Sequence, residues 1–96
     1  MILGSGARQR VGGITLAVGH VESDRPLVGL VAGRRVGNAV ARNRAKRRLR
    51  SVLAGLSLQP GLGYVVIASP GVVTAAYDEL VGWVTLAVRK TEERLR

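Results

Sequence analysis

A dense run of cations is the feature of this sequence whose chemistry is easiest to identify. Eight of the fifteen Lys and Arg residues fall between Arg34 and Arg50, and no Asp or Glu occurs from Arg25 to Tyr77. Guanidinium groups hold phosphate oxygens through two parallel hydrogen bonds, which a Lys ammonium group does not do. The run therefore predicts binding to a polyanion, and a nucleic acid is the partner that fits it best.

The run has the pattern of one amphipathic helix. Its apolar residues recur at steps of three and four, as on a helix lying against a core: Ala41, Ala45, Leu49, Val52 and Leu56. The polar residues of the opposite arc are Arg42, Asn43, Lys46, Arg47 and Arg50. Like charges such as Arg42 and Lys46 repel at this spacing, and no Glu offsets them. This favours a phosphate-binding face over a helix whose charges serve solubility only.

A second group of residues has the spacing of a small metal site. His20, Glu22 and Asp24 alternate in a predicted turn. Acidic and polar residues are also what surface turns contain, so a structural role is favoured. Asp78 and Glu79 have the position of helix-start residues rather than of a two-metal pair. No Ser, His, Cys and acid combination indicates a nucleophile, so we predict no catalytic residue and no metal ligand in the protein.

Strands and helices alternate around the basic run. Apolar alternation predicts a strand over Gly12–Val18 and another over Leu27–Ala32, paired antiparallel across the turn-rich residues 19–26. The apolar run Tyr64–Ala68 is typical of a buried strand. A final helix is expected to start near Thr74, whose hydroxyl would cap it. Its apolar positions, which we expect to face the sheet, are Leu80, Trp83, Val84 and Ala87.

Length and composition predict one domain over residues 1–96, with a short segment 1–10 and a basic loop and helix over 34–56. The chain has 96 residues, 47% of them apolar, and no Cys. No apolar run approaches the roughly 20 residues that span a bilayer, and the first residues lack the pattern of a signal peptide. We therefore expect a cytoplasmic protein without membrane or DNA partners.

Three stretches together resemble the protein subunit of bacterial ribonuclease P: Val28–Leu30, Arg34–Val40 and Arg42–Arg50. That family has a strand, a basic pair, a Gly and then a helix reading Arg-Asn-Arg-x-Lys-Arg-x-x-Arg. The resemblance extends from about Arg8 to Val88. It implies an α+β fold, a small mixed β-sheet with flanking helices in two layers, similar to domain 2 of ribosomal protein S5. It also implies a βαβ unit with a left-handed crossover, against the usual right-handed rule.

The resemblance also implies a function and a set of RNA-binding residues. In the family, the RNA subunit and its Mg²⁺ ions remove the 5′ leader of precursor tRNA, and the protein subunit is not catalytic. A cleft beside the sheet takes the single-stranded leader. Carried over by position, the residues expected to dock on the catalytic RNA are Arg34, Arg35, Asn38, Arg42, Asn43, Arg44, Lys46, Arg47 and Arg50.

The leader side of this chain departs from the family pattern. Members commonly begin with a basic helix bearing an aromatic residue, and here only about a dozen residues precede the first expected strand. That helix is expected to be missing, either because the subunit is short or because upstream residues are not included. Ile14 takes the place of a common aromatic residue of the first strand, and Arg8 and Arg10 are expected to contact the leader electrostatically. Since each stacked base contributes about 1 to 3 kcal/mol, we expect a weaker hold on the leader.

Another class of protein fits the same charge and size. A structural RNA-binding protein, such as a ribosomal protein, would bind RNA without affecting precursor tRNA cleavage. A reader of double-stranded DNA would need a supporting helix before the basic one, whereas a Gly-rich loop and a strand precede Asn38. A membrane-surface helix would need bulky apolar residues where Ala41 and Ala45 stand.

Overall fold

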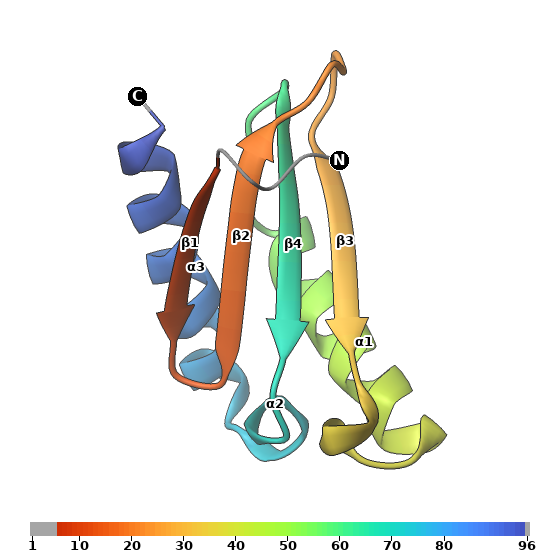
Figure 1. The fold of residues 1–96 in the computed structure, drawn as a ribbon. Coiled ribbons are helices and arrows are strands. Elements are labelled where there is room, and N and C mark those ends of the chain that lie inside the picture. Colours follow the sequence, from red (N-terminus) through yellow and green to blue (C-terminus); the bar gives the residue numbers. More distant parts are fainter. Residues whose placement is uncertain (1–5, 96) are drawn as a thin grey trace.

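The computed structural model of the chain describes residues 6–95. Four strands form one layer and two long helices cover one of its faces, as Figure 1 shows. The strands are β1 (Ala7–Val11), β2 (Ile14–His20), β3 (Leu27–Ala32) and β4 (Leu62–Ala68). The helices are the 3₁₀ turn η1 (Arg34–Val36), α1 (Ala39–Ala54), the short α2 (Gly71–Thr74) and α3 (Tyr77–Arg94).

The strand order is β1-β2-β4-β3, with β3 parallel to β4 and the other pairs antiparallel. The strand expected over Leu27–Ala32 is confirmed, but its predicted pairing with the preceding strand is wrong because β4 lies between them. The physical reason is the apolar character of β4, which favours a central position with a hydrogen-bonded neighbour on each side. The sheet is therefore mixed, as the resemblance implies.

The connection from β3 through α1 to β4 is left-handed. In Figure 1, β3 and β4 both run downward, β4 lies to the left of β3, and α1 lies behind the sheet. A right-handed crossover would have placed β4 on the other side of β3. The unusual hand expected from the resemblance is therefore present.

The core lies between the sheet and the two long helices. Side chains alternate along each strand, so one face of β2 and β4 is buried against the helices. The buried strand residues include Ile14, Leu16, Val18, Leu62, Tyr64 and Val66. The helix residues packed against them include Ala45, Leu49, Val52, Leu80, Val84 and Ala87. The apolar stripes predicted for α1 and α3 are confirmed at these positions.

The start predicted for the final helix is wrong. Thr74 is the last residue of α2, and α3 begins at Tyr77 after Ala76, which makes no side-chain cap. The physical reason is local, because Pro70 begins a separate helical turn and the two alanines after Thr74 are extended. Asp78 and Glu79 do lie in the first turn of α3, where the helix dipole favours them.

A tight hairpin joins β1 to β2 over the ring of Trp83. Gly12 has a φ of 54°, and a Cβ atom there would lie 2.2 Å from the Trp83 ring. Only glycine fits this turn without displacing the indole. Strand β1 itself was missed in the sequence because Arg8, Gln9 and Arg10 hide its alternation, and it includes residues 7–10 of the segment predicted as residues 1–10.

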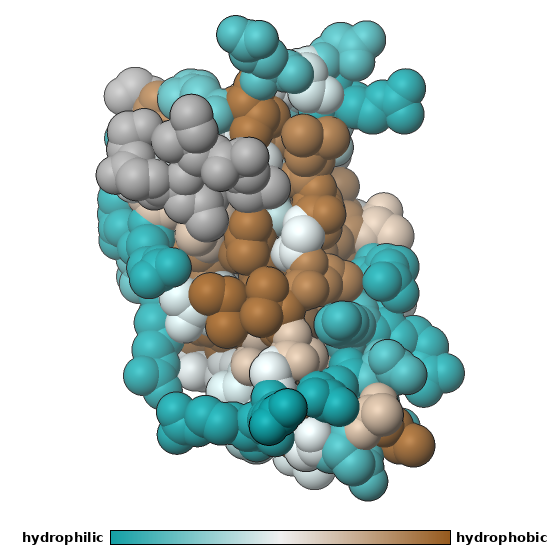
Figure 2. Space-filling view, turned by 45° about the vertical axis from the view of Figure 1, so that its right-hand side comes forward, coloured by the Kyte–Doolittle hydropathy of each residue, from teal (hydrophilic) through white to brown (hydrophobic). Residues whose placement is uncertain are grey.

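The other face of the sheet carries no helix in the described part of the chain. Arg8 and Arg10 lie opposite Ala17 and Thr15 in the register of β1 and β2, so they share this open face. Figure 2 shows apolar surface along this side of the molecule, bordered by hydrophilic residues. Its exposed members on β3 are Leu27 and Val31.

Candidate nucleic-acid interface

The basic helix α1 begins at a defined cap. Gly37, with a φ of 142°, lets the chain turn from η1 into the helix. The side-chain oxygen of Asn38 then accepts a hydrogen bond of 2.9 Å from the main-chain N–H of Ala41, which is an N-cap. Asn38, predicted to contact RNA, thus uses its carbonyl oxygen within the protein, and its RNA contact stays a prediction.

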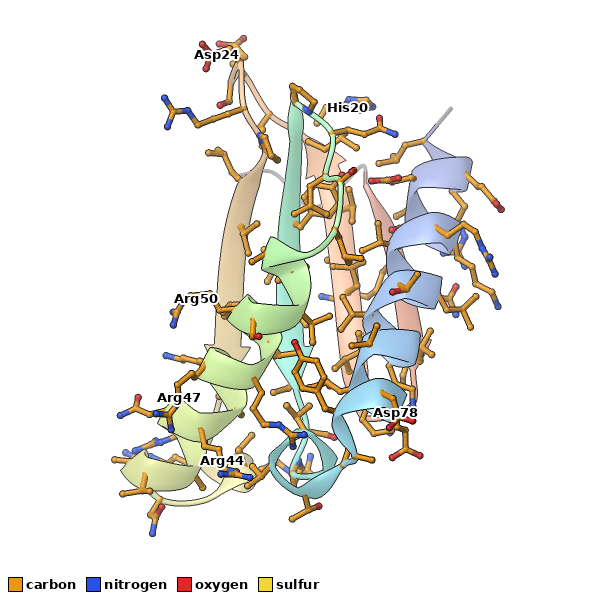
Figure 3. The ribbon with its side chains drawn as sticks, turned by 180° about the vertical axis from the view of Figure 1, so that it is seen from behind. His20, Asp24, Arg44, Arg47, Arg50 and Asp78 are labelled. Carbon is orange, nitrogen blue, oxygen red and sulfur yellow. The ribbon has the colours of Figure 1, made fainter. Side chains whose placement is uncertain are left out.

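Most of the predicted RNA-binding side chains lie on the outer side of α1 and η1. Those that are exposed are Arg34, Arg35, Asn38, Asn43, Arg44, Arg47 and Arg50, whereas Arg42 and Lys46 are half-buried. Figure 3 shows Arg47 and Arg50 pointing away from the body of the protein. The structure therefore brings Asn43, Lys46, Arg47 and Arg50 together around one hollow on α1, whereas Arg44 lies on the side of α1 that faces α2.

The charge pattern of α1 is unfavourable for the helix itself. No acidic residue lies in its first turn, where the dipole is positive and anions are favoured. Arg42 and Arg44 stand near this end, and Arg42, Lys46 and Arg50 follow at the spacing that makes like charges repel. An anion bound to this surface would relieve both effects, so the helix is suited to phosphate groups.

Two arginines of α1 have an internal role that the sequence did not reveal. Arg48 donates to the main-chain oxygens of Val72 at 2.7 Å, Val73 at 3.0 Å and Ala75 at 2.5 Å. The Nε of Arg44 donates to the Val73 oxygen at 3.2 Å. These guanidinium groups satisfy carbonyls at the end of α2 that no helical N–H reaches. Arg48 thus fastens α2 to α1.

The open face of the sheet ends in a groove of about 490 Å³ next to the basic loop. Arg10 of β1 and Arg35 of η1 both line it, together with the apolar side chains of Val31 and Ile67. The fold thus places Arg10, which is predicted to contact the leader, in the same groove as Arg35, which is predicted to contact the catalytic RNA. The combination of cations and apolar surface suits a single-stranded nucleic acid, whose phosphates and bases need both.

A comparison of the sequence with known protein families identifies the family of this chain. Residues 1–92 match the family described as Ribonuclease P. The chain belongs to the ribonuclease P protein family. It is similar to the ribonuclease P protein component of Arthrobacter sp. strain FB24, with 38% identity over 95 residues, covering 95% of this chain and 69% of that protein.

Other relatives are longer than this chain. The ribonuclease P protein component of Thermus brockianus is 45% identical over 64 residues, which cover 67% of this chain and 39% of that protein. The chain thus spans less than half of the length of that relative.

Solved structures share the fold. The RNase P protein from Thermotoga maritima has a TM-score of 0.79 at 17% identity, covering 90% of this chain and 84% of that one. A Staphylococcus aureus RNase P protein mutant has a TM-score of 0.78 at 18% identity, covering 92% of this chain and 76% of that one. The mixed sheet with its flanking helices is therefore the fold of ribonuclease P proteins.

The predicted leader residue Ile14 is among the residues that line the groove with Arg10 and Arg35. The side chain of Ile14 is 1% exposed and belongs to the core. The alternation along β2 turns Ile14 toward the helices and Thr15 toward the open face, and the leader contact of Ile14 stays a prediction. Arg8 and Arg10 are exposed on that face, so their contact with the leader stays a prediction.

The alternating residues His20, Glu22 and Asp24 do not converge. Between residues 6 and 95, no three His, Cys, Asp or Glu side chains are grouped so that they could hold a metal ion. Figure 3 shows His20 and Asp24 at separate tips of the same end of the molecule. Within the same described range, no helix is long and apolar enough to cross a membrane.

Proposed function

We propose that this chain acts with a ribonuclease P RNA to remove the 5′ leader of precursor tRNA, as a subunit that binds RNA and performs no chemistry itself. One observation carries the proposal. Helix α1 directs a set of cations to solvent with no acidic residue on the helix, although this pattern opposes its own dipole. A bound polyanion would offset these unfavourable charges, which explains why the helix carries them.

In the first part of the mechanism, α1 and η1 dock on phosphates of the catalytic RNA. Each phosphate neutralised by Arg or Lys releases condensed counterions, which makes binding strong and dependent on salt. Such contacts fix the position of the protein on the RNA without selecting a base sequence. Cations held between two polyanions also lower the repulsion between the catalytic RNA and its tRNA substrate.

In the second part, the open face of the sheet holds the 5′ leader. The groove with Arg10 and Arg35 offers charge to leader phosphates, and Val31 and Ile67 offer apolar surface to its bases. The groove has no aromatic lining residue, so stacking of the kind that contributes about 1 to 3 kcal/mol per base is absent there. The leader is therefore held mainly by charge and is bound modestly.

We assign the Mg²⁺ ions to the RNA. The candidate ligands in the protein, His20, Glu22 and Asp24, do not form a three-ligand group, so they do not fit a resident metal. Mg²⁺ at the RNA would supply the activated water and stabilise the leaving oxygen. The part of the protein is to lower the electrostatic cost of bringing substrate and ions together, in the cytoplasm where precursor tRNA is made.

Cleavage of a precursor tRNA by a bacterial ribonuclease P RNA at low Mg²⁺, with and without this chain, tests the proposal. We expect stimulation by the protein, and a larger gain in affinity for precursor than for mature tRNA because only the precursor carries a leader. Tight RNA binding without stimulation would instead indicate a structural RNA-binding protein. The matched comparison uses Arg42→Gln with Arg47→Gln, which should lose stimulation while remaining folded.

A further inference from the structure

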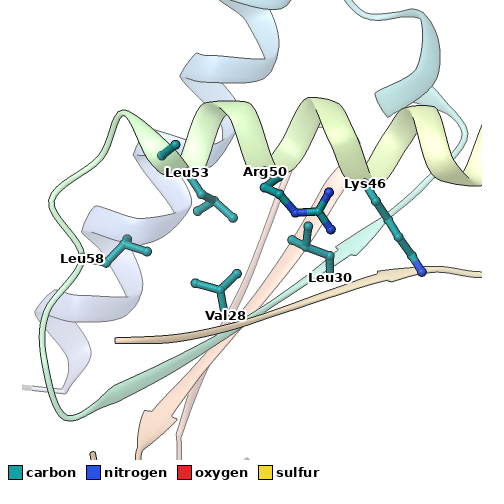
Figure 4. Close-up of a pocket in the computed structure, with 7 residues that line it drawn as sticks. Val28, Leu30, Lys46, Arg50, Leu53 and Leu58 are labelled. Atoms are coloured by element: carbon teal, nitrogen blue, oxygen red, sulfur yellow. The ribbon is translucent and has the colours of Figure 1, made fainter. Parts of the chain in front are cut away.

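A second groove runs between α1 and the outer edge of the sheet. It has a volume of about 390 Å³ and lies on the helix side of β3, as Figure 4 shows. Apolar side chains of β3, α1 and the loop after α1 form its floor: Val28, Leu30, Leu53 and Leu58. Lys46 and Arg50 of α1 extend over it toward β3. The groove is therefore apolar inside and positively charged at its rim.

Within residues 6–95, no other strand pairs with the outer edge of the strand that forms one wall of this groove. β3 is an edge strand whose six residues carry no charge and no proline. Val28 is 45% exposed on this strand. An apolar edge with unpaired main-chain groups is a surface that proteins normally cover or use for binding.

The charge at the rim indicates which partner covers it. Lys46 and Arg50 line both this groove and the adjacent hollow on the outer side of α1, which Asn43 and Arg47 share. The groove is thus continuous with the surface that we assign to RNA phosphates. A partner that brings phosphates to the rim and a flat apolar group to the floor matches both parts.

We propose that an unpaired nucleobase of the RNA docked on α1 inserts into the groove between α1 and β3, with its flanking phosphates on Lys46 and Arg50. The inference rests on the proposed function, since it requires RNA on α1. A base in a duplex could not enter, because its faces are covered by stacked neighbours. Unstacked bases are the elements of RNA that proteins recognise by apolar contact, by stacking on guanidinium planes and by hydrogen bonds to their edges. In this groove, Val28 and Leu53 would give the apolar contact and Arg50 the guanidinium plane. The outer edge of β3 would give the hydrogen bonds to the edge of the base.

Photo-cross-linking tests the proposal directly, because the chain has no Cys. Val28→Cys is labelled with an aryl azide and bound to a bacterial ribonuclease P RNA. Val31→Cys is the matched control, since Val31 is also 45% exposed on β3 but lies on the opposite face of the strand. We expect Val28→Cys to cross-link one or a few unpaired nucleotides that Val31→Cys does not reach. Cross-links confined to duplex regions, cross-links to a second copy of the chain, or none at all would overturn the proposal.

Affinity gives an independent measurement. Val28→Gln places a polar group on the groove floor and should weaken binding of the same RNA about five- to tenfold. The control Leu27→Gln should not weaken it, because Leu27 is 39% exposed on the other face of β3 and lines neither groove. The slope of log K against log salt should be unchanged in Val28→Gln, because no phosphate contact is removed. Equal affinities of Val28→Gln and wild type would refute the inserted base. Cleavage stimulation by the wild-type preparation is measured in parallel, so that failure of the groove contact is distinguished from failure of the proposed function.

Discussion

Helices α1 and α3 cover the same face of the sheet, yet their charges are arranged in opposite ways. α1 carries six basic residues and no acidic one. α3 has Asp78 and Glu79 in its first turn and Arg94 in its last, the order that complements the helix dipole. The charges of α3 therefore suit the folded protein alone, whereas those of α1 suit a protein bound to a polyanion.

The contacts of individual side chains support this contrast. In α3, Arg94 donates to the main-chain oxygen of Arg8 at 2.6 Å and Glu92 accepts a hydrogen bond of 2.5 Å from the Tyr64 hydroxyl. In α1, Arg44 and Arg48 bond to carbonyls around α2. The remaining cations of α1 lie on its outer surface. Within α1, Arg48 thus serves stability, Arg44 bonds to the α2 region while remaining exposed, and the other cations are the ones proposed for RNA.

The largest expected effect comes from removing an arginine of α1 that serves the fold. Arg48→Ala leaves three carbonyls near α2 without a charged donor and should lower the free energy of unfolding by about 2 to 3 kcal/mol. Arg47→Ala, one position away and exposed, should change it by no more than about 0.5 kcal/mol. Urea denaturation of both variants measures the difference. Equal stabilities of the two variants would contradict the claim that Arg48 serves the fold and Arg47 does not.

A second prediction concerns the hydrogen bond between Glu92 of α3 and the Tyr64 hydroxyl inside the protein. The buried Tyr64 hydroxyl donates to Glu92 and accepts from the main-chain N–H of Gln59 at 2.9 Å. Tyr64→Phe leaves both partners unsatisfied and should cost about 1 to 2 kcal/mol at neutral pH. Thermal unfolding at pH 7 gives this value, and an unchanged stability would show that α3 does not depend on the contact.

The same tyrosine predicts a pH dependence. Burial, reinforced by the hydrogen bond to Glu92, raises the pKa of Tyr64 from its usual 10 to about 12. Because the pKa is higher in the folded state, its contribution to stability is complete below about pH 10 and is lost as the pH rises toward 12. The stability difference between wild type and Tyr64→Phe should therefore shrink over this range. A constant difference up to pH 12 would contradict the assignment.

A smaller effect is expected at the start of α1, which has a side-chain cap that α3 lacks. Asn38→Ala removes the hydrogen bond to Ala41 and should lower stability by about 1 kcal/mol. Asn43→Ala, in the exposed interior of the same helix, should leave stability unchanged or slightly higher. If Asn38→Ala retained full stability and lost RNA affinity, Asn38 would be an RNA contact rather than a cap.

The features of the fold that the sequence could predict are those with a local signal. The stripe through Ala45, Leu49 and Val52 predicted α1 and its buried side. Strand β1 was missed because alternating Arg and Gln give no apolar period on an edge strand. The central position of β4 depends on pairings between distant segments, which local patterns do not encode.

For the candidate site, too, the sequence predicts what depends on local spacing but not what depends on contacts between distant segments. The outer cations of α1 follow from helical spacing, since that period sets which residues face solvent. Arg48 lies at the edge of the stripe, and its bonds to Val72 and Ala75 require α2 to be in place. The burial of Ile14 likewise depends on which face of β2 packs against the helices, and the sequence does not state this.

The salt dependence of RNA binding tests the central claim most directly. Arg42→Gln with Arg47→Gln on α1 is compared with Arg89→Gln with Lys90→Gln on α3, since both pairs remove the same net charge. We predict that the α1 pair makes the slope of log K against log salt shallower by up to about two units for a ribonuclease P RNA, and that the α3 pair leaves it unchanged. Equal changes for the two pairs would contradict the account, because binding would then follow net charge rather than the surface of α1.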